Sequence, residues 1–116
     1  MNDPNCLFCK IVAGSLGGPP LYQDEWVTAF RDINPKAPTH ILIVPNEHIA
    51  TINDVEPRHA ELVGRMVLAA QGIAADEGCA EPGYRLVFNV NADAGQTVFH
   101  IHLHLLAGRH LGWPPG

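Results

Sequence analysis

Three histidines alternate with apolar residues near the end of the chain, in the run His100-Ile101-His102-Leu103-His104. Alternation at a period of two predicts a half-buried β-strand, and we expect it over residues 98–106. On such a strand the side chains at i, i+2 and i+4 project from one face, about 6–7 Å apart. The sequence therefore predicts a row of three imidazoles suited to phosphate or a metal ion, with an apolar face opposite that packs in a core.

The composition is that of a globular protein. The 116 residues suffice for one domain with a hydrophobic core, and 47% of them are apolar while 16% are charged. A net charge of -5 without any Lys/Arg run argues against nucleic acid or an anionic membrane as partner. The sequence has no apolar run long enough to span a membrane and no signal-like start. It has three cysteines, an odd number that does not fit a secreted disulfide framework. We therefore expect a cytoplasmic protein.

Hydrophobic periodicity predicts both helices and strands. A short amphipathic helix is expected over residues 6–13, and one long helix of about 20 residues is expected to start near Asp54–Pro57 and stop at Gly78. The glycine-bearing stretch 91–96 is expected to be a loop. Strands are expected at 21–22, 26–30, 39–44, 84–90 and 98–106. This order implies an α+β fold, an antiparallel sheet packed by one long and one short helix.

Cys6 and Cys9 form a C-x-x-C pair. A structural zinc ion takes four ligands, so the pair by itself is a weak indication of metal. Two buried thiols on a helix and a redox pair are the alternatives.

The histidine run resembles the signature of the histidine triad (HIT) nucleotide hydrolases and transferases. Other segments agree in order: Phe8-Cys9-Lys10-Ile11, Ala29-Phe30-Arg31-Asp32-Ile33, Pro38-Thr39-His40, Val44-Pro45, His48-Ile49 and Gly95-Gln96. The tail, Trp113-Pro114-Pro115-Gly116, is similar to the Hint branch, the purine nucleoside phosphoramidases, rather than to the Fhit branch. The resemblance implies a single HIT domain over residues 1–116, with a five-stranded antiparallel sheet and two helices, paired into a homodimer.

The resemblance also implies an enzyme, a hydrolase of purine nucleoside 5′-phosphoramidates such as adenylyl amines. His102 would attack the α-phosphorus, and water would hydrolyse the nucleotidyl-histidine; neutral imidazole suits this role near pH 7. His100 would offer its main-chain carbonyl to the other ring nitrogen of His102. His104 would bind phosphate oxygens or manage the leaving-group proton, and His40 would support the triad. Thr97, where serine is usual in the Hint branch, would donate to the phosphate or the leaving nitrogen.

A further set of residues is expected to bind the substrate. Asp32 would accept from the ribose hydroxyls, and Asn89 would lie near the phosphate and ribose. Trp113 would reach the partner's site or pack at the dimer seam. The loop that ends in Gly95 and Gln96 would offer backbone N–H groups to the phosphate, and Val98 is also expected to bind the substrate. The purine slot would comprise Phe8, Ile11, Phe30 and Ile33.

The resemblance joins His48 and His100 to Cys6 and Cys9 as a structural zinc site that pins the N-terminal helix to the sheet. The chemistry itself needs no cofactor. Three other functions stay open: a dinucleoside polyphosphate hydrolase, a zinc hydrolase with all three triad histidines as ligands, and a non-catalytic nucleotide-binding or interaction dimer. His59 and His110 are expected at the surface without a role.

Overall fold

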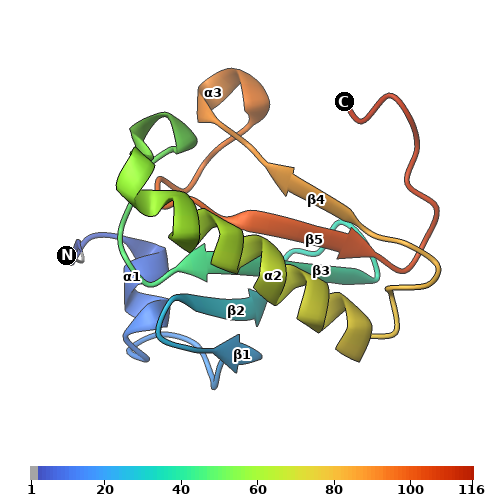
Figure 1. Cartoon of the computed structure of the whole chain (residues 1–116), viewed down its shortest axis with the longest axis horizontal. Helices are drawn as coiled ribbons and strands as arrows, with labels where there is room; N and C mark the ends of the chain where they lie inside the picture. Colours follow the sequence, from blue (N-terminus) through green and yellow to red (C-terminus); the bar gives the residue numbers. More distant parts are fainter. Residues whose placement is uncertain (1–2) are drawn as a thin grey trace.

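A single antiparallel sheet organises the computed structural model, which describes residues 3–116 (Figure 1). Its strands lie in the order β1-β2-β3-β5-β4, so β3 is central and β4 is at one edge. This confirms the predicted α+β class with a five-stranded antiparallel sheet. The strands are β1 (Tyr22–Gln23), β2 (Val27–Arg31), β3 (Thr39–Pro45), β4 (Arg85–Phe88) and β5 (Leu103–Ala107).

The long helix α2 (Ala60–Asp76) covers one face of the sheet (Figure 1). It begins later than expected, because two 3-10 turns, η1 (Ile52–Asp54) and η2 (Pro57–His59), come first. Glu56 lies between the turns with an extended backbone, the conformation that a following proline favours. The helix is followed by Gly78 at a φ of +76°, close to the expected stop. No helix within residues 3–116 is long and apolar enough to cross a membrane.

The sheet separates two apolar clusters. Beneath α2, Ile41 and Ile43 of β3 pack with residues of the helix and with Ile101, Leu103 and Leu105. On the other face, Leu42 and Val44 pack with the short helix α1 (Leu7–Val12), which lies within the range predicted for it. Residues of β3 therefore alternate between the clusters, as side chains on neighbouring positions of a strand must.

Two segments near the histidines differ from expectation. Strand β5 begins at Leu103 rather than at residue 98, because its ladders with β3 and β4 both end there, opposite Ile43 and Phe88. Ile101 instead donates its N–H to the Ile49 carbonyl (2.8 Å). Residues 91–96, expected as a loop, contain one helical turn, α3 (Asn91–Ala94), which ends at Gly95 with a φ of +88°.

Candidate active site

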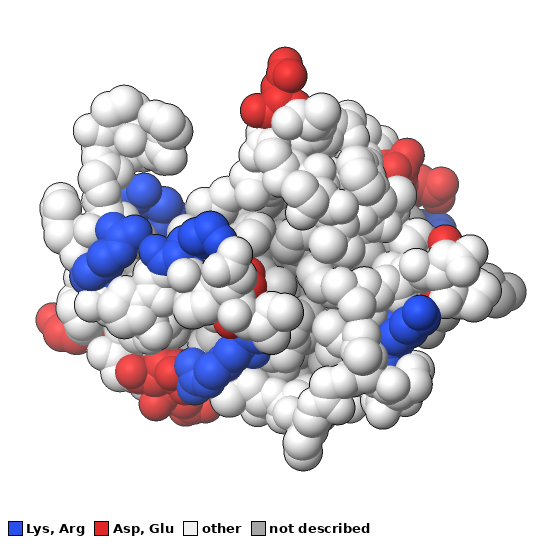
Figure 2. Space-filling model, turned by 180° about the vertical axis from the view of Figure 1, so that it is seen from behind, with Lys and Arg blue, Asp and Glu red and all other residues white. Residues whose placement is uncertain are grey.

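A pocket of about 1020 Å³ opens on the sheet face opposite α2. Figure 2 shows this side of the molecule, where the surface is hollowed and Lys and Arg side chains lie on both sides of the hollow. Twelve of the residues expected to act on or bind substrate line the pocket: Phe8, Ile11, Phe30, Asp32, Ile33, His40, Asn89, Gly95, Thr97, Val98, His102 and His104.

His102 is oriented by a main-chain carbonyl, as the resemblance implied. Its Nδ1–H donates to the His100 oxygen at 2.8 Å, which leaves Nε2 with a free lone pair. Burial lowers the pKa of the His102 ring below its ordinary value, so the imidazole is neutral near pH 7. The ring of Phe8 packs edge-on against it, with centroids 5.0 Å apart. The result is a neutral nucleophile held in one tautomer.

Hydrogen bonds also fix the tautomer of His104. The Lys36 N–H donates to His40 Nδ1 (3.0 Å), so the His40 proton is on Nε2, which donates to His104 Nδ1 (2.9 Å). The proton of neutral His104 is therefore on Nε2. That nitrogen is buried and has no hydrogen-bond partner among the described residues. Burial lowers the pKa of His104 to about 4, so this ring offers an unused neutral donor at the pocket.

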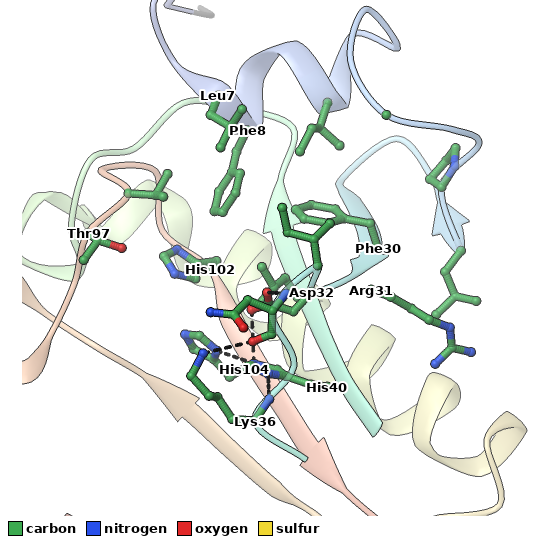
Figure 3. Close-up of a pocket in the computed structure, with 18 of the residues that line it drawn as sticks. Leu7, Phe8, Phe30, Arg31, Asp32, Lys36, His40, Thr97, His102 and His104 are labelled. Carbon is green, nitrogen blue, oxygen red and sulfur yellow. Dashed lines mark hydrogen bonds and ion pairs between the residues drawn. The ribbon is translucent and has the colours of Figure 1, made fainter. Parts of the chain in front are cut away.

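Asp32 lies beside this chain of histidines at one end of the pocket (Figure 3). Its Oδ1 accepts from the Asn34 N–H (2.9 Å), and its Oδ2 is 3.5 Å from His40 Nε2. Asp32, His40 and His104 are close enough to be considered as metal ligands. The 2.9 Å between the His40 and His104 nitrogens is, however, shorter than the about 3.3 Å expected between two nitrogens on tetrahedral zinc. We therefore treat this contact as a hydrogen bond.

A second cluster brings together Cys6, Cys9, His48 and His100. The His100 Nδ1 is 3.3 Å from Cys6 Sγ, 3.4 Å from Cys9 Sγ and 3.2 Å from His48 Nδ1. A tetrahedral zinc ion would separate nitrogen from sulfur by about 3.5 Å and nitrogen from nitrogen by about 3.3 Å. The His100 Nε2–H donates to the Pro45 carbonyl (2.8 Å), so its Nδ1 lone pair faces the cluster. This Cys/His cluster is compatible with zinc.

The three histidines of the run do not all line the pocket: His102 and His104 do, and His100 does not. The alternation is kept, because Ile101, Leu103 and Leu105 lie in the core beneath α2. The side chain of His100, however, is fully buried under α1 and points into the Cys/His cluster. A hydrolytic metal held by all three triad histidines is therefore incompatible with this arrangement.

Other expected site residues lie elsewhere. Gln96 is buried outside the pocket, where its amide donates to the Ala50 and Val98 carbonyls and accepts from the Asn91 N–H. It shapes the turn before Thr97 rather than lining the site. Trp113 also lies outside the pocket and is 82% exposed beside the Arg85 guanidinium.

His59, expected at the surface, is buried. Its Nε2–H donates to Glu47 (3.0 Å), and its Nδ1 accepts from the Glu56 N–H (2.9 Å). The local sequence gave no sign of the Glu47 partner, which comes from the loop after β3.

Sequence reasoning missed part of the pocket wall. Residues 16–21, a Gly/Pro-rich loop to which the sequence analysis assigned no role in the site, line the pocket, as do Leu7 and Lys36. Two leucines flanking the breakers, Leu16 and Leu21, were the available signal that this loop packs on something apolar. Lys36 contributes a cation near the histidines, although its Nζ donates to the Asn34 carbonyl (2.9 Å).

Comparisons with known proteins agree over most of the chain. A model of the HIT domain matches residues 19–111. The chain is 55% identical to the "Purine nucleoside phosphoramidase" of Escherichia coli (strain K12), over 91% of this chain and 89% of that protein. It is 44% identical to the "14 kDa zinc-binding protein" of Zea mays, over 100% and 91%. A solved HIT family hydrolase from Legionella pneumophila Philadelphia 1 superposes with a TM-score of 0.94 at 55% identity, covering 97% of this chain and 100% of that one.

Proposed function

Because the chain belongs to the HIT domain family and is a HIT nucleotide hydrolase, we propose that it hydrolyses purine nucleoside 5′-phosphoramidates through a nucleotidyl-histidine intermediate. The observation that carries this proposal is the 2.8 Å hydrogen bond from His102 Nδ1–H to the His100 carbonyl. It leaves the Nε2 lone pair free in a pocket whose residues suit a nucleotide. The name of the Escherichia coli relative supports the choice of substrate class.

In the first step, His102 Nε2 attacks the α-phosphorus. The nitrogen–phosphorus bond to the ring forms as the bond to the leaving amine breaks, and the amine takes a proton from the Thr97 hydroxyl or from solvent. Water then attacks phosphorus and splits the ring–phosphorus bond. This releases a nucleoside 5′-monophosphate and restores neutral His102. The proton lost by the water reprotonates Thr97 where Thr97 was the donor and otherwise enters solvent.

The remaining residues bind and orient the substrate. The unpartnered His104 Nε2–H donates to a phosphate oxygen, and His40 holds His104 in the tautomer that permits this. Asp32, which lines the pocket, accepts from the ribose hydroxyls. The purine packs among the apolar side chains near Phe8 and Phe30, whose rings are 5.4 Å apart.

The test is to mix the protein with an adenylyl amine, quench, and search by mass spectrometry for a nucleotide on His102. We expect the adduct and turnover in the wild type and neither in His102→Ala. His110→Ala is the control, because His110 is exposed and lies outside the pocket. Release of adenosine monophosphate from a diadenosine polyphosphate but not from the adenylyl amine would replace this function with the alternative hydrolase. Tight binding of adenosine monophosphate without turnover would support a binding protein.

We also propose that Cys6, Cys9, His48 and His100 hold a structural zinc ion. The near-tetrahedral spacing of the four ligand atoms supports this, as does the name of the Zea mays relative. When bound, the ion would cross-link α1 to the loop after β3 and would supply no chemistry to the pocket. Elemental analysis of untagged protein tests the proposal: about one zinc per chain is expected, and free Cys6 and Cys9 thiols with little metal would end it.

A cytoplasmic homodimer completes the proposal. No strand within residues 3–116 pairs with the outer edge of β4, so this edge is available to a second copy. Trp113, exposed in the single chain, would be covered by the partner. The three free thiols suit a reducing compartment. Sedimentation analysis should give twice the 12.6 kDa mass of one chain.

A further inference from the structure

His100 takes part in both functional clusters. Its ring belongs to the Cys/His cluster, where Nδ1 faces two sulfurs and the His48 nitrogen. Its carbonyl belongs to the pocket, because it accepts the proton that sets the tautomer of His102. The ring and the carbonyl belong to one residue and are joined through only two rotatable bonds, so a ring held in place restrains the backbone that carries the carbonyl.

Helix α1 makes a second link between the clusters. Phe8 lies between Cys6 and Cys9 in the sequence, and its ring packs edge-on against His100 (6.0 Å between centroids) and His102 (5.0 Å). The Cys9 N–H donates to Cys6 Sγ (3.3 Å), which ties the start of α1 to the sulfur cluster. A ligand that fixes Cys6 and Cys9 therefore also fixes Phe8, whose ring packs against His102.

The cluster cannot hold itself together by hydrogen bonds alone. The single proton of neutral His100 is used at the Pro45 carbonyl, so Nδ1 presents only a lone pair to its three neighbours. A thiol is a weak donor, and one lone pair accepts well from only one partner at a time. A shared cation would bind all four ligand atoms at the observed spacings. Without it, the lone pairs of these atoms face one another with too few protons between them, and the four side chains are expected to move apart.

We infer that the Cys6/Cys9/His48/His100 cluster is a positioning device for the nucleophile: ligation of the His100 ring holds its carbonyl where it fixes the reactive tautomer of His102. His100 and Phe8 are then positioning residues, and neither takes part in bond making. This inference rests on the proposed function for its kinetic consequence, but its structural consequence can be measured without any turnover.

The expected effect is mainly on the rate of the chemical step. When the His100 carbonyl moves, His102 is free to place its proton on Nε2, and a protonated Nε2 cannot attack phosphorus. Outer supports of this kind are worth about 10–100-fold in activity. We therefore expect kcat to fall by about that factor. KM for the nucleotide should rise less, because the ribose contact at Asp32 lies outside α1 and only the Phe8 side of the purine slot is disturbed.

The cleanest perturbation is His48→Ala, which removes one ligand and leaves Cys6, Cys9, His100 and Phe8 in place. His48→Cys is the matched variant, because it restores a four-ligand set. His110→Ala, at an exposed position that belongs neither to the cluster nor to the pocket, is the control. The wild type stripped with a chelator and reloaded with zinc gives the same comparison in the unaltered chain, in case His48→Ala folds poorly.

Three quantities are measured on each protein: zinc per chain, the ring-nitrogen NMR shifts of His102, and kcat with KM for an adenylyl amine. We expect the wild type, His48→Cys and His110→Ala to keep zinc and the Nδ1–H tautomer. His48→Ala and the stripped wild type should lose zinc, show mixed tautomers, and lose kcat. Reloading the stripped protein should reverse all three changes.

Loss of zinc with the His102 tautomer unchanged would overturn the inference, as would protein that never binds zinc at these residues. A chain that turns over no phosphoramidate, yet whose His102 tautomer follows zinc, would refute the proposed function while supporting the positioning device. The two proposals therefore fail in distinguishable ways.

Discussion

Replacing His104 with leucine should make the free protein more stable and the enzyme slower. In the free protein the His104 Nε2–H is buried without a partner, and such a donor costs about 1–3 kcal/mol. Leucine removes that cost. It also removes the hydrogen bond from His40, worth about 0.5–1.5 kcal/mol, and leaves His40 Nε2 with Asp32 at 3.5 Å. The balance is a gain of about 1 kcal/mol in the free energy of unfolding.

The same nitrogen is the donor that we assign to the phosphate. A hydrogen bond to a charged oxygen is worth about 1.5–3 kcal/mol, which corresponds to a loss of about 10–150-fold in turnover. Stabilisation by adenosine monophosphate should also be smaller in His104→Leu than in the wild type at the same concentration, because the ligand then meets no donor there.

Urea unfolding with and without adenosine monophosphate measures the first effect, and steady-state kinetics measure the second. His110→Leu makes the same exchange at an exposed histidine and should stay within about 0.5 kcal/mol of the wild type. A variant that is less stable than the wild type by about 1 kcal/mol or more, or one with undiminished turnover, would refute the assignment of His104 Nε2 as an unused donor.

Three further predictions concern pH, backbone conformation and the hydroxyl near the phosphate. The folded-state pKa of His104, about 4, lies below its ordinary value of 6.5. The neutral ring therefore contributes its full stability above about pH 6.5, and this contribution is lost as the pH falls toward 4. Across that range, the free energy of unfolding in urea should depend less steeply on pH in His104→Leu than in the wild type. Gly108→Ala should cost about 1–3 kcal/mol in thermal unfolding, because φ is +98° and the new Cβ would lie 2.7 Å from Pro38, whereas Gly64→Ala in α2 meets nothing within 4 Å and should gain about 0.5–1 kcal/mol. Thr97→Ser should keep phosphoramidate turnover and Thr97→Val should lose it; equal rates in the two variants would remove the hydroxyl from the mechanism.

The sequence predicted what local periodicity determines. Alternation placed Ile101, Leu103 and Leu105 in the core, and the apolar stripe of α2 was recognised from its spacing. It did not predict where β5 begins, because a strand extends only as far as its ladders, and those with β3 and β4 both stop at Leu103. The start of α2 was missed for a different reason: the Thr51–Asp54 capping interaction closes a separate turn before Pro57.

The sequence predicted those residues of the site that belong to recognisable motifs. Twelve expected residues line one pocket, because the family motifs mark positions that converge in space. The period-two rule identified the sheet face of His100, but it contains no information about what covers that face. Helix α1 covers it, and so His100 belongs to the Cys/His cluster. The wall at residues 16–21 has no motif at all, and only the fold brings it to the pocket.

The central strand β3 constrains which mutations the sequence can accept during evolution. Leu42 and Val44 face the ligand side of β3, and Ile41 and Ile43 face the helix side, so a substitution at one position leaves the opposite compartment intact. An inserted or deleted residue within β3 would instead exchange the two sets at once, bringing pocket-lining side chains under α2 and core side chains into the pocket. Length variation among descendants should therefore collect in the connections, while variation inside β3 should proceed by replacement alone.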